Sequence, residues 1–189
     1  VMAILSLSKS YDDLRERLGR IIVAESNSGK PVTAEDLGAA GSMALLLREA
    51  MLPNLVQTLE GNPAFVHCGP FANIAHGNSS IIADELALSR SDYVVTEAGF
   101  GAEMGAEKAL HIKSLASGIS PSCIVLNVTV RSMKLHGGGV AGGGGSRPTK
   151  EEIETENVEA VRSGASSNLS RHIKNCLLYT SPSPRDQLQ

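Results

Sequence analysis

Apolar and polar positions along the chain alternate between helical and strand-like patterns. Residues 11–18 predict a helix whose charges lie on a solvated face, with Ser10 as its N-cap and Gly19 at its end. Residues 81–88 carry apolar positions at helical spacing behind a run of N-cap formers, and they predict a second helix. Further helices are expected over residues 33–51, 103–113, 150–162 and 168–175.

Short runs of branched and apolar residues predict strands between these helices. Strands that alternate with helices imply βαβ units, so we expect an α/β fold with a mainly parallel sheet and helices on both faces. Polar turns follow His67, Glu97 and Val130. Because ligands gather at the carboxyl ends of parallel strands, these turns predict one shared site. The predicted strands are residues 20–24, 54–59, 63–67, 92–97 and 123–130.

Composition restricts the classes of protein to which the chain can belong. Its 189 residues are 42% hydrophobic, enough for one domain with its own core. Seventeen basic and twenty acidic residues give a net charge of −3, which offers no electrostatic case for nucleic acid or an anionic membrane. No apolar run approaches a membrane span, and three widely spaced cysteines without a CxxC pattern indicate reduced thiols. We therefore expect a cytoplasmic protein with neither nucleic acid nor membrane as partner.

The stretch from Val66 to Ser80, VHCGPFANIAHGNSS, leads from a predicted strand through a turn of small residues to the helix at residues 81–88. Asn78, Ser79 and Ser80 are all N-cap formers. Unpaired backbone N–H groups at a helix start favour an anion, so the stretch is a candidate anion site. Local chemistry alone favours a capped junction with a histidine in the core.

Several longer motifs carry a resemblance to one family. GPFANIAHGNSS lies between LVQTLEGNPAFVH and VVTEAGFGAEMGAEK, with GKPVTAEDLGAAG upstream and VTVRSMKLHGG downstream. Together these motifs closely resemble formate–tetrahydrofolate ligase over residues 1–175. The resemblance implies an internal piece of a larger P-loop-type ligase, from its nucleotide- and folate-binding region. The glycine-rich phosphate loop that the family requires is expected upstream of this piece.

The same resemblance implies the chemistry and the partners. The family joins formate to tetrahydrofolate with ATP by way of formyl phosphate, needs Mg²⁺ and is assisted by a monovalent cation (K⁺ or NH₄⁺). The full-length ligase is expected to be a homo-oligomer, a tetramer, and the isolated piece is expected to be inactive. Two alternatives stay open: a non-catalytic module that binds phosphate or another anion, and a structural fragment.

Residue by residue, the resemblance assigns functional roles to two turns. His76 matches a catalytic position beside the acyl phosphate, where it would hydrogen-bond a phosphoryl or carboxylate oxygen; a buried structural histidine is the alternative. Glu97 would orient magnesium or a substrate amine, or else cap the following helix. The substrate- and nucleotide-binding residues matched on these turns are Asn73, Gly77, Asn78, Ser79, Ser80, Glu97, Gly99, Phe100 and Gly101.

A third group of candidates, Arg131, Lys134 and His136, matches the family signature VRxLKxHGG. The resemblance makes Arg131 and Lys134 catalytic and His136 substrate-binding. Two cations at the carboxyl end of a strand would suit a polyanionic substrate, and solvated surface charges are the alternative. Val128 and Met133 depart from the family pattern, and the metal ligands stay unassigned.

Two segments stand outside the predicted elements. Residues 137–146, GGGVAGGGGS, carry too much glycine for a packed element and predict a mobile loop. The last residues, 176–189 (CLLYTSPSPRDQLQ), resemble translated sequencing-adapter read-through. We therefore expect a domain of residues 1–175 followed by a foreign tail.

Overall fold

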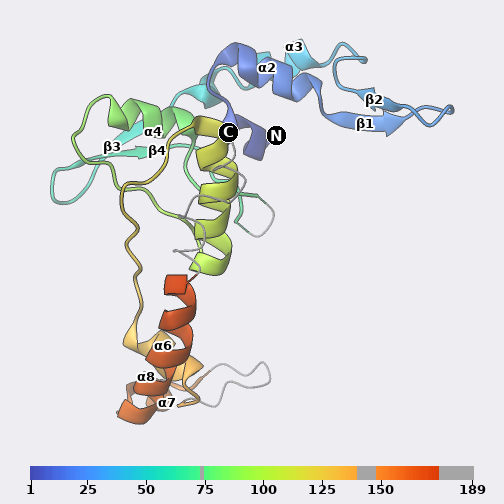
Figure 1. Ribbon diagram of the computed structural model, residues 1–189. Coiled ribbons are helices and arrows are strands. Elements are labelled where there is room, and N and C mark those ends of the chain that lie inside the picture. The colour runs from blue at the N-terminus through green and yellow to red at the C-terminus, as the bar shows by residue number, and fades with distance from the viewer. Residues whose placement is uncertain (73–74, 140–147, 175–189) are drawn as a thin grey trace, which may run out of the picture. The chain divides into compact units, whose positions relative to one another are not determined.

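A computed structural model describes residues 1–72, 75–139 and 148–174, which divide into two compact units (Figure 1). The first unit comprises residues 1–100 and 108–120, and the remainder forms the second. No described helix is long and apolar enough to cross a membrane. The predicted site residue Asn73, most of the glycine-rich segment and the tail at 176–189 lie outside the described residues.

Two helices of the first unit confirm the sequence prediction closely. Helix α2 (Tyr11–Gly19) begins after Ser10, whose side chain accepts the Asp13 N–H. Helix α4 (Ile81–Leu88) begins after Ser80 in the same way. The other helical elements of this unit are α1 (Met2–Leu7), α3 (Ala40–Leu46), η1 (a 3₁₀ turn, Glu49–Met51), η3 (a π-helix, Ala109–Ser114) and α5 (Leu115–Ser117).

The strands form two antiparallel hairpins. Strand β1 (Ile22–Glu25) pairs with β2 (Pro31–Thr33), and β3 (Asn54–Gln57) pairs with β4 (Pro63–Val66). The short connections within each pair leave no room for the helical crossover that parallel strands require. The predicted mainly parallel sheet is therefore absent from the described residues. Residues 92–97, expected as a strand, form no strand among the described residues.

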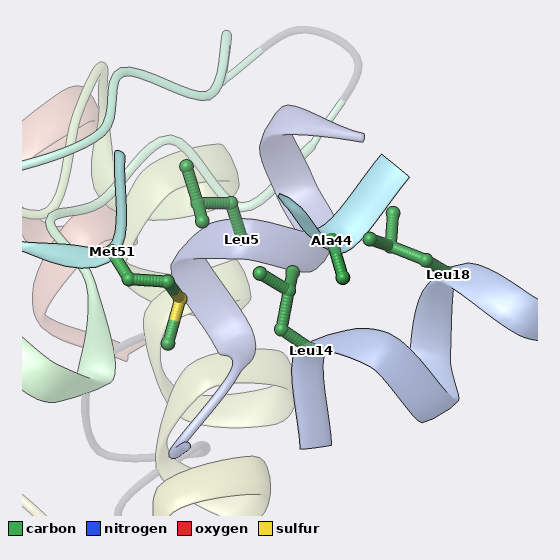
Figure 2. Packing of buried hydrophobic residues seen from close by; sticks show 5 residues of the cluster. All are labelled: Leu5, Leu14, Leu18, Ala44 and Met51. Carbon is green, nitrogen blue, oxygen red and sulfur yellow. The ribbon is translucent and has the colours of Figure 1, made fainter. Parts of the chain in front are cut away.

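The core of the first unit lies between α1, α2 and α3 (Figure 2). Ile82 of α4 and Cys68, which follows β4, pack against it and are partly buried. The turn between β4 and α4 is therefore anchored at both ends on this core. The buried cluster consists of Leu5, Leu14, Leu18, Ala44 and Met51.

The helix predicted over residues 33–51 begins later than expected. Thr33 and Asp36 do exchange the two hydrogen bonds of a capping box, Thr33 N to Asp36 Oδ2 at 2.8 Å and Asp36 N to Thr33 Oγ1 at 3.2 Å. The chain then makes a turn, in which Gly38 has a φ of +65°. A residue in that left-handed conformation ends helical geometry, and α3 starts only at Ala40.

The second unit is helical. Its elements are η2 (a π-helix, Ala102–Ala106), α6 (Val130–His136), α7 (Lys150–Glu154), α8 (Val158–Gly164) and η4 (a π-helix, Ala165–Leu169). Helices α6 and α8 pack so closely that a Cβ on Gly164 would lie 1.8 Å from the Met133 carbonyl oxygen.

Two predictions in this unit are wrong. Residues 123–129 belong to no described strand. Thr129 accepts the Ser132 N–H, so Val130 begins a helix. The single helix expected over 150–162 is two helices, because Asn157 takes an N-cap position and accepts the Ala160 N–H.

Candidate functional site

A buried histidine joins the end of β4 to the start of α4. The Nδ1 of His67 lies 2.6 Å from the Ser80 Oγ, and its Nε2 lies 2.7 Å from the Ala50 carbonyl oxygen. Because a carbonyl only accepts, Nε2 carries the proton and Nδ1 accepts the Ser80 hydroxyl hydrogen. The Ser80 Oγ in turn accepts the Ala83 N–H. Ser80, predicted to bind substrate, is fully buried and engaged within the protein.

His76, the predicted catalytic histidine, is buried against α1. Its Nε2 lies 3.1 Å from the Ser6 Oγ, which also lies 3.2 Å from the Met2 carbonyl oxygen and 3.0 Å from that of Ala3. The Ser6 hydroxyl either donates its hydrogen to the His76 Nε2 or donates it to a carbonyl and accepts the Nε2–H. In either case the buried Nε2 of His76 is engaged by Ser6. This arrangement favours the structural alternative for His76.

Two lysines place positive charge around the turn. Burial, followed by the charges of Lys113 and Lys108, lowers the pKa of His76 below its ordinary value. Lys113 is buried and pairs with Asp84 of α4, with 2.5 Å between Nζ and Oδ2, while the Lys108 Nζ donates to the Ala72 carbonyl oxygen. Sequence reasoning missed both lysines, because their partners are distant in the chain and no local pattern marks them.

The turn at Gly77 and the loop at Glu97 are held together. Gly77 has a φ of +70°, and a Cβ there would lie 2.2 Å from the Ala72 Cβ, so only glycine fits. A Cβ on Gly99, which is buried, would lie 3.1 Å from the Gly77 carbonyl oxygen. The buried Asn78 donates its Nδ2 to the Glu97 carbonyl oxygen at 3.0 Å. Four predicted binding residues thus come together within one unit.

The Asn78 oxygen and the remaining predicted residues of these turns have different surroundings. The Asn78 Oδ1 is buried without a hydrogen-bond partner among the described residues. Ser79 Oγ lies 3.5 Å from the His67 carbonyl oxygen. Phe100 is exposed, and Gly101 belongs to the second unit. A buried acceptor without a donor costs free energy, so the Asn78 Oδ1 needs a donor that the described residues do not supply.

The basic residues of the third predicted group lie on α6, so their expected position at the end of a strand is wrong. Arg131 and His136 are exposed. Lys134 is buried, and its Nζ donates to three main-chain carbonyls that include the last turn of α7. Lys134 thereby holds α7 against α6. The acceptors are the carbonyl oxygens of Glu152 at 3.0 Å, Ile153 at 2.7 Å, and Thr155.

Metal-binding side chains do not gather in the part of the chain that the structure describes: no group of three or more His, Cys, Asp or Glu lies together there. Glu97, which is exposed, provides a single carboxylate at the loop. One carboxylate fits magnesium, which commonly binds through one or two carboxylates, waters and substrate phosphates.

Comparison with known proteins gives a consistent result. The profile of the family "Formate--tetrahydrofolate ligase" matches residues 1–183, which include the first part of the tail set apart above. The formate–tetrahydrofolate ligase of Desulforamulus reducens is 54% identical over 96% of this chain and 32% of its own length. The cytoplasmic C-1-tetrahydrofolate synthase of Homo sapiens is 52% identical over 96% of this chain and 20% of its length. The mitochondrial monofunctional C1-tetrahydrofolate synthase of Mus musculus is 51% identical, and the chain covers 19% of it. The chain therefore spans a third or less of each of these relatives.

Proposed function

The chain belongs to the formate–tetrahydrofolate ligase family, and we propose that it supplies part of the active site of an ATP-dependent ligase that joins formate to tetrahydrofolate. In this proposal ATP phosphorylates formate, an amine of tetrahydrofolate attacks the formyl carbon, and phosphate leaves. The observation that carries the proposal is the contact between the turn at Gly77–Asn78 and the loop at Glu97–Gly99 within one unit.

The charge at this contact supports an anionic intermediate. Phosphoryl transfer depends mainly on positioning and on stabilisation of developing charge. Lys113 is already paired with Asp84, so we assign the direct electrostatic role to Lys108. The N-terminus of α4 adds its dipole in the same sense. His76, neutral and bonded to Ser6, keeps the turn in shape.

Asn78 supports a role in positioning the amine. Its Oδ1 is buried and unpaired among the described residues, whereas its Nδ2 is fixed on Glu97. An amine N–H of tetrahydrofolate donated to this oxygen would orient the nitrogen lone pair toward the formyl carbon. Such positioning lowers the barrier by reducing the freedom lost in the reaction.

The other implied components are part of the same proposal. Magnesium would be held by Glu97 together with the nucleotide phosphates. Arg131 and His136, both exposed on α6, would bind a polyanionic part of a substrate. The monovalent cation and the tetramer also belong to this proposal. So does the cytoplasmic location, because the names of the relatives include both cytoplasmic and mitochondrial proteins.

The fold of the longer protein is proposed on similar grounds. Residues 92–97 and 123–129 belong to no helix or strand and expose branched or aromatic side chains, including Tyr93, Val95 and Val125. Such side chains suit a pleated, covered surface. We propose that these segments become strands of a mainly parallel sheet, completed by chain outside residues 1–189 in a P-loop-type ligase.

A chimaera tests the proposed activity. The matching segment of the Desulforamulus reducens ligase is replaced by residues 1–183 of this chain, and formyltetrahydrofolate formation is followed with ATP, formate and tetrahydrofolate. We expect product that requires all three substrates, whereas the isolated 189-residue chain forms none. A folded chimaera that binds phosphate or ATP but forms no product would support a non-catalytic anion-binding module instead.

A further inference from the structure

Phe100 combines a strained backbone with an exposed ring. Its φ is +64°, and only one other non-glycine residue among those described, Cys68, has a positive φ. Glycine adopts this conformation freely, and Phe100 lies between Gly99 and Gly101. A bulky side chain at such a position lowers stability unless it makes compensating contacts.

Folding of the first unit covers only a small part of Phe100. The Phe100 side chain is 72% exposed, so its ring gains little from burial there. Cys68 differs, because it packs against the core of α1, α2 and α3. Residues held in sparsely populated backbone conformations cluster at ligand sites, where the strain positions a group for binding.

The backbone below the ring is fixed beside the candidate site. The Glu97 carbonyl oxygen accepts the Asn78 Nδ2–H at 3.0 Å, and buried Gly99 packs against the Gly77 carbonyl oxygen. Phe100 follows Gly99 directly, so the ring extends from a loop that is anchored on the 77–78 turn. With its backbone held, the Phe100 side chain has only two χ angles to order on binding a ligand.

We infer that Phe100 is a specificity-determining residue whose ring stacks on the planar heteroaromatic ring of a substrate. This inference rests on the proposed function, in which ATP carries an adenine and tetrahydrofolate a pterin, while formate has no ring. Phe71 and Tyr93 of the same unit are also exposed, but neither has the positive φ of Phe100. Offset stacking between ring faces is favourable and needs no particular hydrogen-bonding pattern.

The test uses the chimaera described above with Phe100→Leu and Phe100→Tyr. Leucine keeps an apolar side chain and the backbone strain but removes the flat ring, whereas tyrosine keeps the ring. Binding of ATP and of tetrahydrofolate is measured separately by calorimetry, and the KM for formate serves as an internal control. We expect Phe100→Leu to weaken binding of one ring-bearing substrate about tenfold, Phe100→Tyr to retain it, and the KM for formate to stay unchanged.

Whether Phe100→Leu weakens the binding of ATP or that of tetrahydrofolate shows whether the stacked ring is adenine or pterin. Unchanged binding of both in Phe100→Leu, or an equal loss that extends to formate, would overturn the inference and indicate that the ring packs on another segment of the longer protein. Ring-dependent binding without turnover would overturn the proposed activity and leave the stacking role intact. Failure of the unsubstituted chimaera to bind either substrate would overturn both.

Discussion

Gly77 illustrates how a single residue sets the geometry of the site. Its left-handed backbone and its approach to Ala72 are separate requirements, and each excludes a side chain. Gly38 has a similar φ of +65°, but a Cβ there would meet nothing within 4 Å. The two positions therefore separate the cost of the backbone conformation from the cost of the close contact.

We expect Gly77→Ala to lower the free energy of unfolding by at least about 3 kcal/mol, because it adds a steric clash to an unfavourable φ. Gly38→Ala, the matched control, should cost about 1 kcal/mol from the backbone alone. Urea unfolding of both variants of the 189-residue chain measures the difference. Equal losses would mean that Gly77 and Ala72 are not in contact.

His76 makes stability depend on pH. Burial and the lysine charges lower its folded-state pKa below the ordinary 6.5, so below that pH the unfolded chain takes up a proton that the folded chain does not. The stabilisation is complete above the unfolded pKa and is lost as pH falls through the folded pKa.

The variant His76→Gln should therefore lose stability less steeply than the unsubstituted chain as the pH falls from 6.5 toward 5. Glutamine is expected to keep a hydrogen bond to Ser6 while removing the titrating ring. Denaturant melts at several pH values provide the slopes. Identical slopes for the two proteins would show that His76 does not titrate as a buried group.

At the scale of elements, the sequence predicts helices better than strands. Ser10 and Ser80 cap α2 and α4 as expected, because capping and helical periodicity are local. Residues 92–97 and 123–129 have strand-like composition but no partner among the described residues, and a strand exists only through its partner. The contacts of His76 and Lys113 were equally beyond prediction, because they join distant segments.

Lys134 is the clearest case in which a predicted catalytic residue has a structural partner. Its buried ammonium group satisfies carbonyls at the end of α7, where a positive charge also complements the helix dipole. Arg131 lies on the same helix and is exposed. The pair therefore distinguishes a structural lysine from a surface charge.

We expect Lys134→Met to lower the free energy of unfolding by about 2 kcal/mol or more, because it leaves buried carbonyls without donors. Arg131→Met, on the exposed face, should change it by no more than about 0.5 kcal/mol. Thermal or urea unfolding monitored by circular dichroism compares the two. A Lys134→Met protein as stable as Arg131→Met would contradict the structural role.

At the scale of the molecule, long motifs identified the family and local chemistry located the turns, but neither gave the contacts between them. Gly77, Asn78, Glu97 and Gly99 were assigned separately, and the structure brings them together through the Asn78 side chain and two glycines. The chain covers 32% of the Desulforamulus reducens ligase, so the parallel sheet expected from the sequence would need strands from outside it. A fold that depends on absent segments cannot be derived from the pattern of this chain alone.

We propose that the turn at Gly77–Asn78 and the loop at Glu97–Gly99 form one substrate site. Turnover per folded molecule of the Asn78→Ala chimaera tests it most directly, with Asn62→Ala, an exposed asparagine in the β3–β4 connection, as control. We predict a fall of about tenfold or more for Asn78→Ala, with a stability loss of about 1–2 kcal/mol, and no change in turnover for Asn62→Ala. Turnover of Asn78→Ala at the unsubstituted rate per folded molecule would contradict the claim.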